Sequence, residues 1–105
     1  MLASALAACA SQTDTQLEGV KTARSVLAEW ALVEEQTAKA RTPSVYGRMA
    51  RRQARDELRT ARQELEERPA AAQLIDGLVQ GSPSAAALHQ ADKTLEPLEK
   101  QLESA

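Results

Sequence analysis

The sequence predicts an all-α protein: an antiparallel helical hairpin that is extended to a small three- or four-helix bundle. Apolar residues recur at three- and four-residue steps through most of the chain, which is the spacing of one face of a helix. Four glycines and few β-branched residues argue against a sheet protein. The length of 105 residues allows a single small domain.

The first long helix is expected over about residues 14–40. One face of this segment is apolar and carries Leu17, Val20, Ala23, Leu27, Trp30 and Ala31. The helix is expected to end before Pro43, because proline disfavours the helical conformation in the residue that precedes it. Either Thr42 or Ser44 is then the expected N-terminal cap of the next helix.

A second helix is expected over about residues 43–68. Its apolar face carries Ala50, Ala54, Leu58, Ala61 and Leu65. The link between the two helices is short, so we expect them to be antiparallel neighbours. In a hairpin the numbers of facing residues have a nearly constant sum, and the two apolar faces match at a sum of 84 or 85. This register sets Trp30 opposite Ala54, and Glu34 opposite Arg51 for a salt bridge.

Two further helices are expected over about residues 70–80 and 83–103. Gly81 is the expected cap at the end of the first of them. The pair Ser82–Pro83 combines a capping residue with a proline, which is a typical start signal for a helix. Pro97 lies inside the last helix and is expected to bend or interrupt it, because proline removes one backbone donor.

The N-terminal segment differs in kind from the rest of the chain. Its first ten residues carry no charge, and they contain the only cysteine, Cys9. The four residues Leu6-Ala7-Ala8-Cys9 resemble the lipobox of bacterial lipoproteins, in which Leu, a small residue and Ala or Gly precede the acylated cysteine. The resemblance implies cleavage before Cys9, a diacylglycerol thioether on its sulfur and a membrane anchor made of several acyl chains.

This resemblance sets the expected organisation of the chain. Residues 1–8 are expected to be a signal-like segment. A complete signal peptide has a basic region and a longer apolar region, so either this segment is truncated or the match to the lipobox is a coincidence. Residues 9–16 are expected to hold the lipidation site and a polar tether, and residues 17–105 to form one helical domain. Ala10 stands where an Asp would favour inner-membrane retention, so the resemblance implies the periplasmic face of the outer membrane.

The second expected helix carries a stripe of arginines. Six of them fall within a sector about 100° wide, namely Arg48, Arg51, Arg52, Arg55, Arg59 and Arg62. Guanidinium groups bind carboxylate or phosphate with paired hydrogen bonds. The stripe is therefore a candidate surface for acidic lipid headgroups, cell-wall carboxylates or an acidic partner helix. The alternative is a solvated face, or one neutralised within the bundle by Glu34, Asp92, Glu96, Glu99 and Glu103.

The sequence offers no support for catalysis, a cofactor or a metal site. It contains no nucleophile elbow, phosphate loop or HExxH pattern. The only histidine, His89, is expected at the surface, and Trp30 and Tyr46 are expected to pack in the core or at the hairpin end. The chain has a net charge of −2 and lacks base-stacking aromatics beside its arginines, which argues against nucleic acid as a partner.

Two functions from different classes remain. The first is a small periplasm-facing lipoprotein whose helical bundle acts as a structural or interaction module through a charged surface. Its partners would be the membrane, through the lipid, and a protein or the cell wall. The second is an unlipidated cytoplasmic adaptor or oligomerisation module. Both allow a homo-oligomer, since the many alanines on helix seams permit the close approach of another helix.

Overall fold

The described residues of the protein form a bundle of four helices. The computed structural model describes the backbone of residues 2–40 and 44–105, and the side chains of residues 12–40 and 44–105. Within these ranges it contains four helices and no strand, which confirms the all-α prediction. The helices are α1 (Leu2–Ala38), α2 (Ser44–Glu64), α3 (Pro69–Gln80) and α4 (Ala85–Glu103).

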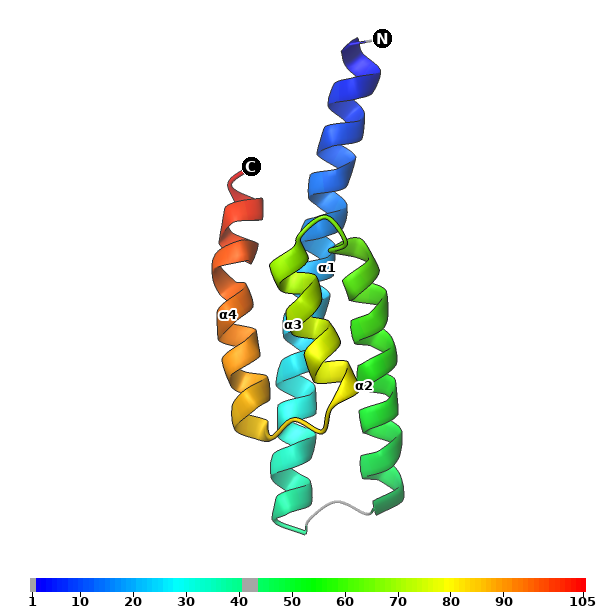
Figure 1. Ribbon diagram of the computed structural model, residues 1–105, viewed down its shortest axis with the longest axis vertical. Helices are drawn as coiled ribbons and strands as arrows, with labels where there is room; N and C mark the ends of the chain where they lie inside the picture. The colour runs from blue at the N-terminus through cyan, green and yellow to red at the C-terminus, as the bar shows by residue number, and fades with distance from the viewer. Residues whose placement is uncertain (1, 41–43) are drawn as a thin grey trace.

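Successive helices run in opposite directions and form an elongated bundle of 58 × 22 × 18 Å (Figure 1). Helix α1 is the longest, and it packs against both α2 and α4. The short α3 packs mainly against α2 and touches α4 only lightly. Within the described ranges, α2 and α4 therefore lie on a diagonal of the bundle and are not neighbours, and this arrangement decides which charged residues can meet.

Helix α1 begins much earlier than expected. A helix from about residue 14 and a polar tether over 9–16 were predicted, but the helix runs without a break from Leu2 to Ala38. The physical reason is composition, because the segment is rich in alanine and has neither proline nor glycine before Gly19. The N-terminal turns of α1 extend past the ends of the other three helices (Figure 1).

The hairpin of α1 and α2 has the predicted register. Arg51 Nε lies 2.6 Å from Glu34 Oε2, and the guanidinium carbon of Arg55 lies 5.0 Å from the centre of the Trp30 ring. The numbers of the residues in each pair add to 85, as predicted. At the other end of the hairpin, Gly19 approaches α2 so closely that a Cβ atom there would lie 2.9 Å from the Cβ of Glu64.

The core runs along the seams between the helices. Its large, fully buried members are Val20, Leu27, Trp30, Leu58, Leu65, Ile75 and Leu88. Small residues such as Ala23 and Ala61 are also fully buried, and they leave room for the larger side chains opposite them. The apolar faces predicted from the spacing of α1 and α2 are therefore the faces that form the core.

Several helix ends differ from the prediction. Helix α2 ends at Glu64 rather than near residue 68, because Pro69 holds the preceding Arg68 outside the helical region, at φ −115° and ψ 81°. Pro69 itself is the first residue of α3, a position that tolerates its missing N–H. Of the two predicted caps of α2, Thr42 lies outside the described residues, as does Pro43, and Ser44 is the first residue of the helix.

The start of α4 is also shifted. Gly81 caps α3 as expected, with an extended backbone rather than a left-handed one. Ser84, and not Ser82, caps α4: its hydroxyl accepts a hydrogen bond from the backbone N–H of Ala87 at 3.1 Å. Helix α4 continues through Pro97 without interruption. Pro97 is exposed, so water can reach the backbone carbonyl that lacks its usual donor.

Candidate functional site

The arginine stripe of α2 is partly used to hold the hairpin together. Arg51 donates two hydrogen bonds to Glu34 on α1, from Nε to Oε2 at 2.6 Å and from Nη2 to Oε1 at 3.1 Å. The hydrogen bond from Arg51 is the main reason why the pKa of Glu34 lies below its ordinary value. The same bond raises the pKa of Arg51. The predicted bridge is therefore a two-pronged pair and is only about a quarter exposed.

Arg55 binds the end of α3. Its Nε donates to the carbonyl of Val79 at 3.3 Å and its Nη2 to the carbonyl of Gly81 at 3.1 Å. The same guanidinium lies over the ring of Trp30, whose Nε1 donates to Glu34 at 3.0 Å. A cation at the C-terminus of a helix satisfies carbonyls that have no partner within the helix. Arg55 therefore joins three helices.

The remaining arginines of the stripe fall into two groups. Arg62 lies 3.2 Å from Asp76 of α3, and Arg59 lies 2.9 Å from Asp56 on its own helix. Arg48 and Arg52 are exposed and form no hydrogen bond or ion pair with the residues that the structure describes. The stripe thus combines arginines that bind other helices with arginines that face solvent.

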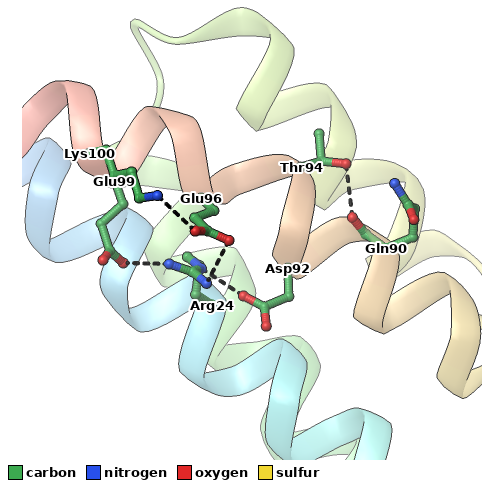
Figure 2. Close-up of polar contacts among 7 residues, drawn as sticks. All are labelled: Arg24, Gln90, Asp92, Thr94, Glu96, Glu99 and Lys100. Atoms are coloured by element: carbon green, nitrogen blue, oxygen red, sulfur yellow. Dashed lines mark hydrogen bonds and ion pairs between the residues drawn. The ribbon is translucent and has the colours of Figure 1, made fainter.

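The acidic residues of α4 do not neutralise this stripe. Because α2 and α4 are diagonal, Asp92, Glu96 and Glu99 instead contact Arg24 of α1, a residue that was not singled out from the sequence (Figure 2). Glu103 is exposed and forms no ion pair with the described residues. Arg24 lies 2.7 Å from Asp92, 3.4 Å from Glu99 and 3.9 Å from Glu96. Its hydrogen bond to Asp92 is the main cause of the raised pKa of Arg24.

Lys100 completes this group of charges on α4. Its Nζ lies 3.0 Å from Glu96 Oε1, one helical turn away (Figure 2). That hydrogen bond is the main reason why the pKa of Glu96 is lowered. A sequence signal for the group did exist: Asp92, Glu96 and Glu99 share one face of α4 at steps of four and three residues. Arg24 is the single arginine among residues 1–40.

The other residues singled out from the sequence have different surroundings. Cys9 lies on α1, but its side chain is outside the described part of the chain. Trp30 is buried in the core, whereas Tyr46 is 60% exposed near the hairpin end. His89 lies at the surface as predicted, and its Nε2 is 2.8 Å from Glu35 Oε1, which links α4 to α1.

A groove of about 650 Å³ lies where α3 and α4 touch only lightly. It is lined mainly by apolar side chains, including Leu74, Leu95 and Leu98, and Arg68 is its one ionisable residue. Such a lining suits an apolar group better than a charged substrate.

The described residues lack two further features. They include no group of three or more His, Cys, Asp or Glu side chains that could hold a metal ion. Among these residues, no helix is both long and apolar enough to cross a membrane.

The comparisons with known proteins found no match: no family model, no curated protein and no solved structure is similar to this chain.

Proposed function

We infer that this chain is a bacterial lipoprotein, anchored by acyl chains on Cys9, whose helical bundle acts as an interaction module through a charged surface. The proposal places the bundle at the periplasmic face of the outer membrane. Two features support it: the lipobox-like residues 6–9, and the position of these residues on α1, the helix that continues into the bundle.

The observation that carries the proposal is the continuity of α1. The side chain of Gln16 accepts a hydrogen bond from Arg68 Nε at 3.0 Å, near the end of the bundle. Residue 9 lies seven residues earlier on the same helix, or about 10 Å further along its axis. The N-terminal turns stand clear of the other helices (Figure 1). The helical residues between Cys9 and Gln16 would act as a spacer. An anchor at Cys9 would therefore leave the bundle free to bind a partner.

The intact mass of the protein from its native membrane tests the anchor. We expect the loss of residues 1–8 and the addition of a diacylglycerol group and a further acyl chain on the new N-terminus. A Cys9→Ser variant should stay unprocessed and leave the membrane fraction. A Ser11→Ala variant is the matched control, since it keeps all four lipobox-like residues. Full recovery of Cys9→Ser in the membrane fraction would contradict the proposal.

The alternative function is an unlipidated cytoplasmic adaptor or oligomerisation module. One observation favours it: Val45, Tyr46 and Met49 of α2 are more than half exposed, which is unusual for large apolar side chains that lie close together. This function requires an intact Met1 and a free thiol on Cys9. Labelling of Cys9 by a thiol reagent in freshly lysed cells, with an unmodified mass, would favour it over the lipoprotein.

A further inference from the structure

The outward face of α2 is exposed along its whole length. A row of residues at alternating steps of three and four runs along this face: Tyr46, Met49, Gln53, Asp56, Thr60 and Gln63. All six are exposed, and Tyr46 and Met49 are exposed by 60% and 67%. This spacing is that of the central row in a two-stranded coiled coil.

The two flanks of this row carry opposite charges. The flank that faces away from α1 holds Val45, Arg52 and Arg59, one helical repeat of seven residues apart. The opposite flank holds Ala50, Glu57 and Glu64, with the same repeat. Beyond the first repeat, one flank is therefore basic and the other is acidic.

We propose that this face binds a second copy of the same chain, with the two α2 helices side by side and parallel. In a parallel pair, each residue of the first flank meets the residue five positions later on the other copy. This rule pairs Arg52 with Glu57 of the second copy and Arg59 with Glu64 of the second copy. An antiparallel pair would instead bring arginines to arginines and glutamates to glutamates, so the charges select the parallel arrangement.

Polar contacts within each chain affect the strength of the contact between the two α2 helices. Asp56 would face Asp56 of the second copy. Arg59 lies 2.9 Å from Asp56 of its own chain, so its guanidinium would be shared between that carboxylate and Glu64 of the second copy. Gln53 donates to Glu57 at 3.0 Å and can turn toward the partner instead. Because only the first repeat of the row is apolar, we expect a weak and reversible dimer rather than a permanent one.

The parallel arrangement has a consequence for the whole molecule. Its two-fold axis runs along the bundle, so the N-terminal ends of both α1 helices point the same way. Two copies held in this way could be anchored in one membrane. The inference rests on the interaction part of the proposed function but not on lipidation, so the two can fail separately.

Sedimentation equilibrium of the full chain tests the dimer. A Cys9→Ser background excludes crosslinking through the native thiol. We expect the mass to rise with concentration from monomer to dimer.

Arg52→Glu should weaken the association about tenfold, because the two-fold symmetry removes two ion pairs at once. The double variant Arg52→Glu, Glu57→Arg should restore it. Lys93→Glu, on the exposed surface of α4, is the matched control and should change nothing.

Directed crosslinking tests the orientation. In a parallel pair, a Met49→Cys variant should form a disulfide with itself under mild oxidation, and a Thr60→Cys variant should do the same. A mixture of the two variants should give no crosslink between them, whereas an antiparallel pair would give mainly that product. Circular dichroism of each variant confirms that the helices are retained.

A chain that stays monomeric at every concentration measured would overturn the proposal. Association that is insensitive to Arg52→Glu would overturn it as well. Neither result would affect the mass measurement that tests lipidation.

Discussion

The carboxylate of Glu34 accepts three hydrogen bonds: two from Arg51, at 2.6 and 3.1 Å, and one from the indole of Trp30, at 3.0 Å. This arrangement joins α1 to α2 beside the largest buried side chain of the protein. The carboxylate is about one-fifth exposed, so water screens it less than it screens a surface ion pair. Glu34 is therefore expected to matter more for stability than the other glutamates of α1.

The substitution Glu34→Gln should lower the free energy of unfolding by about 1–2 kcal/mol at neutral pH, because it removes a charged acceptor from the buried indole of Trp30 and the partly buried guanidinium of Arg51. The pKa of Glu34 in the folded chain lies below 4.5, mainly because Arg51 donates to it. The stabilisation is therefore present above pH 4.5 and is lost as the pH falls through the lowered folded-state pKa. Urea unfolding at neutral and acidic pH measures this effect.

A matched control for this prediction is Glu29→Gln. Glu29 lies on the same helix, is exposed, and forms no ion pair with the described residues. The Glu29→Gln substitution should leave the free energy of unfolding unchanged at neutral and at acidic pH. If Glu34→Gln lowered the free energy of unfolding by the same amount in strong acid, the loss would come from packing rather than from charge.

The contact between Glu34 and Arg51 could be predicted from sequence because a short link restricts a hairpin to few registers. Periodicity identified the buried faces of α1 and α2, and matching those faces set the register. The contact between Arg24 and Asp92 could not be predicted in this way. It joins two residues that are 68 positions apart along the chain, and it depends on α4, rather than α3, packing beside α1.

The arrangement of α3 and α4 also explains why the acidic residues of α4 were wrongly considered as partners of the arginine stripe. Asp92, Glu96 and Glu99 have the right charge but lie on the helix that α2 does not touch. The start of α1 was missed for a different reason, since polar residues such as Ser11 and Thr13 indicated a tether. Helix propensity and continuity with the packed part of α1 outweigh that local signal.

Two glycines should respond to alanine in opposite ways. A Cβ at Gly19 would lie 2.9 Å from the Cβ of Glu64 and 3.3 Å from the carbonyl oxygen of Ala61, so α1 and α2 would have to separate. We expect Gly19→Ala to lower stability by about 1–2 kcal/mol despite its better helix propensity. Gly77 on α3 has open space around the same position. Gly77→Ala should raise stability by about 0.5–1 kcal/mol.

Thermal unfolding of the two variants beside the wild type checks this pair. The glycine positions are both inside helices, so the gain in helix propensity is common to them and only the surroundings differ. Equal stabilisation by both substitutions would show that α1 and α2 are not in close contact at Gly19.

Arg24 should be the most important charge of the contact between α1 and α4. Without it, three carboxylates on one face of α4 would repel one another, since Asp92, Glu96 and Glu99 all lie within 4 Å of its guanidinium. Arg24→Gln should cost about 1–2 kcal/mol at low ionic strength. The loss should shrink in about 1 M salt, where the screening length is only about 3 Å.

Lys100 provides the comparison for Arg24. It contacts the same acidic face through Glu96, but its side chain is 71% exposed. Lys100→Gln should therefore change stability by less than about 0.5 kcal/mol. Thermal unfolding at two salt concentrations separates the two variants. A salt-independent loss in Arg24→Gln would mean that packing of the arginine stem, rather than its charge, is what α4 requires.

Arg55 and Arg52 lie three residues apart on α2, yet they should differ sharply when they are changed to lysine. Arg55 reaches the carbonyls of Val79 and Gly81 with two separate nitrogens and covers the ring of Trp30. Lysine keeps the charge but has no planar fork, so Arg55→Lys should lower stability by about 1 kcal/mol. Arg52→Lys should change it by less than about 0.5 kcal/mol, because Arg52 is exposed and contacts no other helix of its own chain among the described residues. The fluorescence of the single tryptophan gives a second readout, since only Arg55→Lys removes the guanidinium group that lies over its ring. Equal losses in the two variants would contradict the prediction, because they would show that the contact of Arg55 with the end of α3 adds nothing specific to stability.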